Sequence, residues 1–532
     1  MTEKILHGPK MKSLVEMTSL GEFFFKHAEK YRDNICQIDA NIDKSETYSS
    51  VKRRSVRLAI ALQKMGVTSR DVVLSCSYNS LDNSIPILST FYLGAKIVNL
   101  DPSLGLRNSK HLITYVSPRI IFVEEASVGM VEECLKGTDL KPGIIVYGNS
   151  DKYAKFADVT SPQEDEDKFR PTKVDIHDTA VMLFSSGTTG LPKAICHSHY
   201  SFLQLVDIGA KYGFDEASIL HFTTFYWMSG MEILARCFLR GGVRVFSGDL
   251  DGETILKMVQ KYKLLAIFMA PIYSYKLTRI DDSKKTKYDT SSLRCILTGG
   301  TPLSGEQLKR LKVLFPNADV IFGYGMTELA RVSSFYPQTD KHLMESKPTS
   351  CGRIAPEISV KIVDAETDEI LGPNQTGELH IKSPSLMVGY HNLDSSECFD
   401  RDGFLKSGDL GYYDEDKCLY VVGRVKEMFK YLSWHIVPSS IEGVIMEHPA
   451  VKEVVVVGVP REEEGHVPAA CVVLNEGCNA RKEEIETFVA ERVTDREQLR
   501  GGVVFAKELP RTPTGKVVRK EAQERVLKML AQ

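Results

Sequence analysis

The chain has 532 residues, of which 43% are hydrophobic and 26% are charged, and its formal net charge is −3. This composition is ordinary for a globular protein and excludes a disordered or fibrous chain, while the weak negative charge gives no support to nucleic-acid binding. We expect two or more domains, because a single hydrophobic core rarely extends over so many residues.

Short apolar segments alternate with amphipathic stretches, which predicts an α/β fold. The predicted strands are 71–77, 120–124, 143–147, 180–184, 266–270, 295–297 and 319–322. Apolar residues at helical spacing predict helices over 253–262 and 304–315. Near the carboxyl end, a compact unit is predicted with a strand at 453–457 and a helix at 482–492.

Residues 185–193 read Ser-Ser-Gly-Thr-Thr-Gly-Leu-Pro-Lys and follow the predicted strand 180–184. The glycines allow a tight turn that brings backbone N–H groups close to an anion, while the hydroxyls and the lysine add donors and positive charge. The spacing is neither that of a Walker loop nor that of a dinucleotide-binding loop. We interpret this segment as a polyphosphate cradle formed by Ser185, Ser186, Gly187, Thr188, Thr189, Gly190 and Lys193.

Four further motifs follow along the chain. They are Gly323-Tyr324-Gly325-Met326-Thr327-Glu328, Ser407-Gly408-Asp409, Gly423-Arg424 with Lys430 downstream, and Pro513-Thr514-Gly515-Lys516. Their order resembles that of the adenylate-forming enzymes, a superfamily that includes acyl-CoA synthetases, insect luciferases and the adenylation domains of peptide synthetases. The chain resembles this superfamily over nearly its whole length, with the nearest likeness to insect luciferases and luciferase-like synthetases, those of glow-worm flies included. The resemblance implies ATP-dependent adenylation of a carboxylic acid with release of pyrophosphate.

The same resemblance implies a large amino-terminal domain of α/β subdomains with a β-rich portion, over residues 1–422, and a small mobile α+β domain over 423–532. Gly423 to Lys426 is the expected hinge. In this scheme Lys516 bridges the substrate carboxylate and the α-phosphate in the transition state. Lys430 lies on the opposite face of the small domain, which is presented for the second half-reaction.

The nucleotide site follows from the residue types and from the resemblance. Tyr324 is expected to stack on adenine, with Gly323 and Gly325 allowing close backbone approach. Thr327 is expected to donate to the phosphate chain. Glu328 is the expected ligand of Mg²⁺, a cation that uses one or two carboxylates together with substrate phosphates; an ordinary glutamate at a helix start is the alternative.

The ribose and acyl sites complete this scheme. Asp409 is expected to accept hydrogen bonds from the ribose hydroxyls, with support from Arg424. The acyl pocket is expected at the ends of two predicted strands, where ligands of open α/β sheets bind. Trp227 is interpreted as a wall of this pocket, with plain core packing as the alternative. The residues at the strand ends are Thr298, Gly299, Gly300, Thr301 and Phe322, and with Tyr324 they favour a flat or aromatic acid.

Two departures from the family pattern bear on the second step. Tyr226 and Trp227 occupy the positions of the histidine pair of beetle luciferases, so a proton-transfer role for histidine does not carry over. Ser433 stands where a glycine normally lets the pantetheine arm of CoA pass, and a side chain there hinders thioester formation. His197 and His199 follow the phosphate loop on an expected helix and are interpreted as packing or surface histidines, not as metal ligands.

Three functions remain open at this point, and the resemblance favours the first of them. The first is a luciferase-like enzyme, in which O2 oxidises the acyl-adenylate with light emission and without a further metal or flavin. The second is an acyl-CoA ligase that passes the adenylate to CoA. The third, a catalytically silent binding protein, is disfavoured because all the lysines and carboxylates of the motifs are present.

The sequence also predicts a cytoplasmic protein without a membrane span. The eleven cysteines are scattered without a Cys-x-x-Cys pair, which is typical of a reducing compartment. The amino-terminus lacks the apolar stretch of a signal peptide, and no apolar run has the length of a membrane span. The carboxyl end lacks the peroxisomal Ser-Lys-Leu signal.

Overall fold

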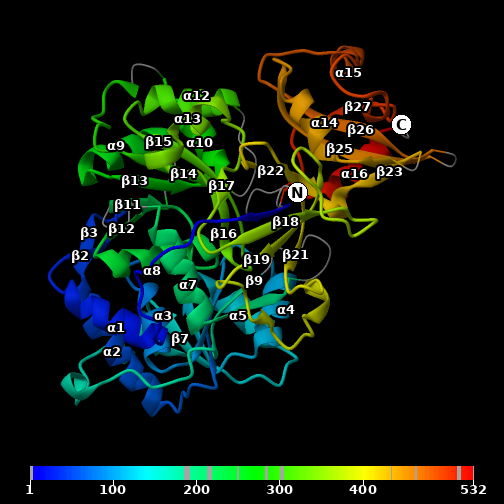
Figure 1. The fold of residues 1–532 in the computed structure, drawn as a ribbon. Helices are drawn as coiled ribbons and strands as arrows, with labels where there is room; N and C mark the ends of the chain where they lie inside the picture. The colour runs from blue at the N-terminus through cyan, green and yellow to red at the C-terminus, as the bar shows by residue number, and fades with distance from the viewer. Residues whose placement is uncertain are drawn as a thin grey trace. The chain divides into compact units, whose positions relative to one another are not determined.

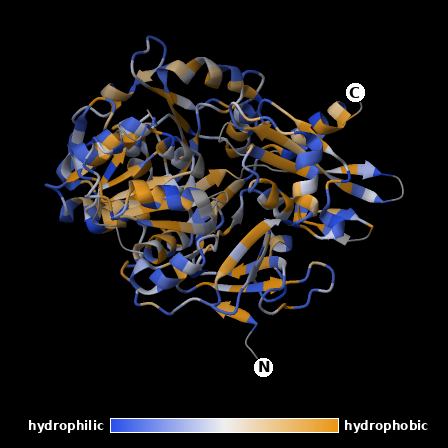
Figure 2. Cartoon of the chain, turned by 90° about the horizontal axis from the view of Figure 1, so that it is seen from above, coloured by the Kyte–Doolittle hydropathy of each residue, from blue (hydrophilic) through white to orange (hydrophobic). Residues whose placement is uncertain are grey.

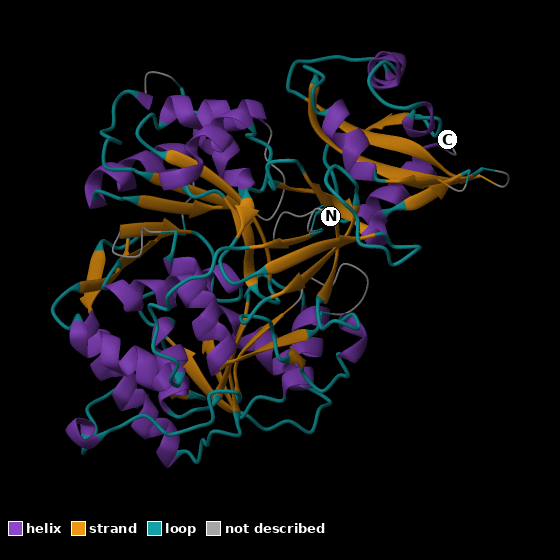
Figure 3. Cartoon of the chain, in the orientation of Figure 1, coloured by secondary structure: helices purple, strands orange, loops and turns teal. Residues whose placement is uncertain are grey.

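We describe the protein from a computed structural model, which covers residues 4–184, 192–212, 218–248, 251–281, 285–299, 305–432, 434–461, 464–511 and 517–530. Helices and strands alternate along the chain, and the strands form four sheets (Figures 1 and 3). The predicted mixed α/β class is therefore confirmed. Among the described helices, none is both long enough and apolar enough to cross a membrane.

The chain folds into two compact units. The large unit consists of Leu6–Ser359 and Lys382–Gly403, and the small unit of Met1–Ile5, Val360–Ile381 and Phe404–Gln532. The predicted boundary between residues 422 and 423 separates the expected mobile domain from the rest of the chain, and it stays a prediction.

The first sheet of the large unit has the strand order β20-β10-β9-β5-β4-β6-β7-β8. Its central strands are parallel, and β10 and β20 add an antiparallel edge. The bounds are β4 (Val72–Cys76), β5 (Lys96–Leu100), β6 (Ile120–Glu124), β7 (Gly143–Tyr147), β8 (Ala154–Lys155), β9 (Thr179–Phe184), β10 (Ala194–Ser198) and β20 (Gly389–Tyr390). Strands this apolar are typical of a parallel sheet buried on both faces, and β4, β6 and β9 are almost entirely buried. Figure 2 shows hydrophobic residues on many strands of the chain.

Helices cover both faces of this first sheet. On one side, α4 (Leu106–Val116) and α5 (Val128–Leu135) contribute to a core cluster with Leu74, Val98 and Met182. The cluster on the other side contains residues of α1 (Leu20–Lys30), α2 (Tyr48–Lys64), α3 (Ser84–Tyr92), α7 (His199–Ala210) and α8 (Met228–Arg240). The strands predicted at 71–77, 120–124, 143–147 and 180–184 correspond to β4, β6, β7 and β9 and are confirmed.

The second sheet of the large unit has the order β17-β16-β15-β14-β13-β11-β12-β2-β3. Its bounds are β2 (Ile35–Asp39), β3 (Lys44–Thr47), β11 (Ser218–His221), β12 (Val243–Phe246), β13 (Ala266–Met269), β14 (Cys295–Gly299), β15 (Asp319–Met326), β16 (Ala330–Ser334) and β17 (Arg353–Ile354). One face packs against α9 (Gly252–Tyr262), α10 (Pro271–Thr278) and α12 (Gly305–Leu314) (Figure 1). The strands predicted at 266–270, 295–297 and 319–322 and both predicted helices are confirmed, although β14 and β15 extend further.

Two further sheets are formed mainly by residues of the small unit. The third sheet has the order β1-β18-β19-β21-β22, with β1 (Ile5–His7), β18 (Ser359–Val363), β19 (Gly377–Lys382), β21 (Leu405–Tyr413) and β22 (Leu419–Arg424). The fourth contains β23 (Phe429–Tyr431), β24 (Trp434–Ile436), β25 (Val451–Arg461), β26 (Gly465–Leu474) and β27 (Val503–Phe505). Residues of α14 (Pro438–Ile445), α15 (Lys482–Ala490) and α16 (Arg519–Leu530) contribute to its two apolar clusters. The predicted strand 453–457 and helix 482–492 are confirmed.

One expected helix is wrong at its start. The segment Ala194–Ser198 is β10, which pairs antiparallel with β9, and helix α7 begins only at His199. Ser198 ends the strand and caps the helix, because its hydroxyl accepts the N–H of Ser201 while the Ser201 hydroxyl accepts the N–H of Ser198. His197 therefore lies on a strand, and both histidines are fully buried.

Candidate functional site

The hairpin between β15 and β16 carries the first group of predicted site residues. Thr327 and Glu328 lie in the turn between the two strands, so the alternative of a glutamate at a helix start is wrong for Glu328. Gly325 is required by close packing, because a Cβ there would stand 2.0 Å from the carbonyl oxygen of Ala330. The hairpin thus places a hydroxyl and a carboxylate beyond the carboxyl end of a parallel strand, where ligands of such sheets bind.

Glu328 is held by the segment that contains β20. The N–H of Met387 donates to the carbonyl oxygen of Glu328 at 2.7 Å. The hydroxyl of Tyr390 donates to Oε1 of Glu328 at 3.4 Å. Burial, together with the negative charge of Glu328, raises the pKa of Tyr390, so the phenol keeps its proton and acts as the donor.

Tyr390 also contacts Lys193 of the predicted phosphate loop. Strand β20 pairs with β10 so that Tyr390 lies opposite Ile195, only two residues after Lys193. The Lys193 Nζ lies 5.0 Å from the centroid of the Tyr390 ring, within the range of a cation–π contact. The structure therefore brings together Lys193 and Glu328, which are far apart in the sequence, through a tyrosine that we did not predict.

The remaining residues of the predicted phosphate cradle lie outside the described part of the chain. These are Ser185, Ser186, Gly187, Thr188, Thr189 and Gly190. Their predicted roles stay predictions. The described residues show only where this segment starts and ends: β9 ends at Phe184, β10 begins at Ala194, and the two strands pair antiparallel.

A buried histidine supports the same hairpin from β10. The Nε2 atom of His197 lies 2.8 Å from the carbonyl oxygen of Thr327, and the histidine is fully buried. Burial lowers the pKa of His197 to about 4. No sequence signal distinguishes this residue from an ordinary core histidine.

The predicted ribose residues form an ion pair in the small unit. Asp409 on β21 and Arg424 on β22 lie opposite one another, and Arg424 Nε is 2.9 Å from Asp409 Oδ1. Asp409 is 5% exposed. Gly408, the residue before it on β21, has a φ of +71°, and its N–H donates to Glu378 Oε1 at 3.0 Å. A glycine is favoured there because side chains rarely adopt that backbone conformation.

Lys430 lies on β23 of the same unit and is exposed. Its Nζ is 3.1 Å from Oε1 of Glu366, and the same oxygen is 3.8 Å from Nε2 of His435, the residue opposite Lys430 on β24. Such exposed pairs contribute little stability. Lys516 and Ser433 lie outside the described residues.

The predicted acyl-pocket residues are divided between two clusters. Thr298 and Phe322 lie side by side on β14 and β15, as do Gly299 and Gly323 on the same strands. The buried hydroxyl of Thr298 has no hydrogen-bond partner among the described residues, and Phe322 packs on the second sheet's core. Gly300 and Thr301 lie outside the described residues.

Trp227 is placed elsewhere in the large unit. It precedes α8, stacks edge-on against Tyr226 with ring centroids 5.2 Å apart, and packs on the core cluster of the first sheet. Its surroundings thus differ from those of Thr298 and Phe322. The role of Trp227 as a pocket wall stays a prediction.

The carboxylate of Glu328 offers the oxygen ligands that a magnesium ion prefers. Among the described residues, no group of three or more His, Cys, Asp or Glu side chains is arranged to hold a metal. A cation beside Glu328 would therefore take most of its ligands from substrate phosphates and water, which is the usual coordination of Mg²⁺.

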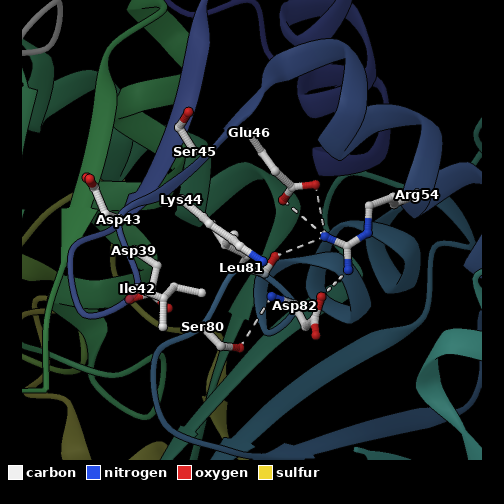
Figure 4. A pocket seen from close by; sticks show the side chains of 10 residues that line it. All are labelled: Asp39, Ile42, Asp43, Lys44, Ser45, Glu46, Arg54, Ser80, Leu81 and Asp82. Carbon is white, nitrogen blue, oxygen red and sulfur yellow. Dashed lines mark hydrogen bonds and ion pairs between the residues drawn. The ribbon is translucent and has the colours of Figure 1, made fainter.

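Two cavities are lined by described residues of the large unit. One of about 480 Å³ is lined by Thr179, Cys196 and the segment from Val388 to Ser396, with Phe399, and so includes Tyr390. The other, of about 600 Å³, lies between the β2–β3 hairpin and the segment before α3 (Figure 4). Arg54 on its wall binds Glu46 and Asp82, and none of the predicted site residues lines it.

The chain matches the AMP-binding enzyme family over residues 24–391 and the AMP-binding enzyme C-terminal domain over residues 440–516. Because the first match covers more than half of the chain, the protein belongs to this family and is an adenylate-forming enzyme. The resemblance read from the motifs is therefore confirmed.

Among its relatives are insect luciferases and plant CoA ligases. Luciferin 4-monooxygenase of Photinus pyralis is 31% identical over 99% of this chain and 98% of its own length. The peroxisomal OPC-8:0-CoA ligase 1 of Arabidopsis thaliana is 29% identical over 94% of this chain and 92% of its own length. The solved structure of the luciferase-like enzyme from the nonluminescent Zophobas morio mealworm is 57% identical, covers 80% of this chain and 100% of its own, and has a TM-score of 0.78.

Proposed function

We propose that this enzyme adenylates a hydrophobic or aromatic carboxylic acid with ATP and then transfers the acyl group to the thiol of CoA. The observation that carries the proposal is the convergence of Lys193, Tyr390 and Glu328 at the tip of the β15–β16 hairpin. The ammonium group of Lys193 and the carboxylate of Glu328 both contact Tyr390, and such a pair is suited to bind a triphosphate together with its metal ion.

The first step joins two anions. An oxygen of the acid carboxylate bonds to the α-phosphorus of ATP, and the bond from that phosphorus to the pyrophosphate oxygen breaks. Lys193 is suited to neutralise the leaving pyrophosphate, and Glu328 is suited to hold Mg²⁺ against the phosphate oxygens. Mg²⁺, when bound, supplies charge neutralisation of the triphosphate.

The nucleoside is assigned to two groups of residues. Tyr324 and its flanking glycines are assigned to adenine, and Asp409 with Arg424 to the ribose. The ion pair between Asp409 and Arg424 supports this assignment, because the guanidinium orients a carboxyl group whose oxygens can accept from hydroxyl groups. Lys516 is assigned to the transition state of this step.

In the second step the sulfur of the CoA thiol bonds to the acyl carbon, the bond from that carbon to the phosphate oxygen breaks so that AMP leaves, and the thiol proton is released to solvent. Lys430 is assigned to this step. Thioester formation is favoured because a relative with 57% identity comes from a nonluminescent species, and because relatives of this chain include CoA ligases. This order of preference reverses the one that the resemblance to insect luciferases suggests.

Light emission is the second candidate. In this reaction the adenylate activates the adjacent carbon for deprotonation and attack by O2. The specific support is the identity of 29–31% with luciferin 4-monooxygenases over nearly the whole chain, for example 31% over 97% of this chain for that of Photuris pensylvanica. The predicted obstruction by Ser433 also favours this candidate.

The decisive experiment supplies ATP, Mg²⁺ and CoA with a panel of fatty, aromatic and luciferin-type acids, and follows pyrophosphate, acyl-CoA and light in the same wells. Pyrophosphate with thioester and no light supports the proposal. Pyrophosphate with light and little thioester establishes the second candidate. Lys516→Ala supplies the baseline, because it is expected to lose adenylation, and Ser433→Gly should raise thioester formation if Ser433 obstructs CoA.

A further inference from the structure

The hydrogen bond from His197 to Thr327 connects two parts of the candidate site. His197 lies on β10 of the first sheet, four residues after Lys193, whereas Thr327 lies in the hairpin turn of the second sheet. The Nε2 atom of His197 is 2.8 Å from the Thr327 carbonyl oxygen. The contact therefore joins the strand that follows the phosphate loop to the turn that carries Glu328.

The geometry determines which nitrogen carries the proton. A carbonyl oxygen only accepts hydrogen bonds, so Nε2 is the donor. The other nitrogen, Nδ1, is buried and has no hydrogen-bond partner among the described residues. The imidazole is accordingly neutral, with its single proton on Nε2, and it cannot act as a cationic phosphate ligand.

The Thr327 carbonyl belongs to the peptide group that leads into Glu328. The next carbonyl, that of Glu328 itself, accepts the N–H of Met387 at 2.7 Å. Two successive peptide planes are thus held from two different segments, one by a side chain of β10 and one by the backbone before β20. This arrangement limits the directions in which the Glu328 carboxylate can point, because the backbone on both sides of its Cα is fixed.

We propose that His197 is a positioning residue, whose Nε2–H orients the Thr327–Glu328 peptide so that the Glu328 carboxylate faces the metal-bound phosphates beside Lys193. The proposal rests on the proposed function of Glu328 and deepens it. His197 contacts neither substrate nor metal and acts through the backbone of the hairpin. A plain stabilising role is the competing explanation, and it predicts no specific effect on magnesium dependence.

The test compares three substitutions at one position. His197→Gln keeps a long side chain with an N–H donor, His197→Asn keeps a donor on a shorter side chain, and His197→Leu removes the donor. The readouts are the rate of ATP–pyrophosphate exchange as a function of Mg²⁺ concentration, and the dissociation constant of MgATP measured by equilibrium dialysis without acid. Substitution of a residue that orients a metal ligand typically lowers metal affinity or activity about 10- to 100-fold.

We expect His197→Leu to lower the exchange rate about 10- to 100-fold and to require more Mg²⁺, with His197→Gln close to the wild type and His197→Asn near the Leu variant. If His197→Leu does not fold, the comparison of Gln with Asn carries the test. Wild-type magnesium dependence in a folded Leu or Asn variant, or equal loss in Gln and Asn, would overturn the proposal.

His199 provides a matched control. It is equally buried, and its Nδ1 accepts the N–H of Leu20 in α1, whereas the hydrogen bond of His197 goes to the hairpin turn. His199→Asn should lower thermal stability without a change in magnesium dependence, and a change equal to that of the His197 variants would overturn the specific role. A wild-type protein that binds MgATP but shows no exchange with any acid would overturn the proposed function, while the dialysis series would still decide the role of His197.

Discussion

The hydroxyl of Tyr390 lies 3.4 Å from Oε1 of Glu328, so a residue of β20 donates to the carboxylate in the β15–β16 turn. The same tyrosine faces Lys193 with its ring, at 5.0 Å from the Nζ atom. One side chain therefore orients the expected magnesium ligand and contacts the expected phosphate-binding cation.

The two contacts of Tyr390 can be separated by substitution. Tyr390→Phe keeps the ring beside Lys193 but removes the donor to Glu328, and it should slow adenylation about tenfold, the effect of one hydrogen bond to a charged group of about 1.5 kcal/mol. Tyr390→Ala removes both contacts and should slow it further. ATP–pyrophosphate exchange measures both rates, and equal rates for Phe and Ala would contradict a role for the ring.

Asp409→Asn should raise the KM for ATP about tenfold or more, because a neutral amide is a weaker acceptor for ribose hydroxyls and for Arg424. The substitution keeps the size of a side chain that is 5% exposed, so the fold should be retained. The control compares ATP with 2′-deoxy-ATP. The wild type should bind 2′-deoxy-ATP more weakly than ATP, whereas the variant should bind the two nucleotides with nearly equal affinity. A variant that still distinguishes the two nucleotides fully would remove Asp409 from ribose recognition.

Lys430→Ala should leave pyrophosphate exchange intact and reduce thioester formation about 100-fold, an effect comparable to the loss of one preorganised donor. Glu366→Gln is the matched control, because it removes the ion-pair partner of Lys430 while leaving the lysine in place. Because an exposed ion pair contributes little to the free energy of unfolding, the Glu366→Gln variant should keep wild-type stability. Equal loss of both half-reactions in Lys430→Ala would argue against a role confined to the second step.

Three buried histidines make stability depend on pH. Burial lowers the pKa of His197 and of His199 to about 4 and that of His221 to about 3. The unfolded chain binds these protons near pH 6.5 and the folded chain does not, so the free energy of unfolding is unaffected above this pH and falls as pH decreases below it. The slope contributed by each histidine is about 1.4 kcal/mol per pH unit down to its folded pKa.

Chemical denaturation between pH 7.5 and 4.5 measures this slope. His199→Asn should reduce it by the share of one histidine, since the asparagine does not titrate. An unchanged slope in this variant would show that His199 is already protonated in the folded protein.

Much of the fold could be predicted because its signals are local. The apolar segments 120–124 and 143–147 predict strands with the same bounds as β6 and β7. Helix α9 begins where Asp251 accepts the N–H groups of Glu253 and Thr254, and the apolar spacing over 253–262 matches its length. Burial of one face or both dictates these patterns residue by residue. The expected helix at His197 was wrong because β10 depends on pairing with β9 and β20, and β20 is distant in the sequence.

The sequence by itself determined the adenylate-forming family, the inventory of lysines and carboxylates, and most strand positions, because each of these depends on neighbouring residues. Only the tertiary structure decided which side chains orient these lysines and carboxylates. Tyr390 is 62 residues from Glu328, and His197 is 130 residues from Thr327. Contacts over such separations arise from the register of β20 on β10 and from the position of the β15–β16 turn, and no local pattern encodes them.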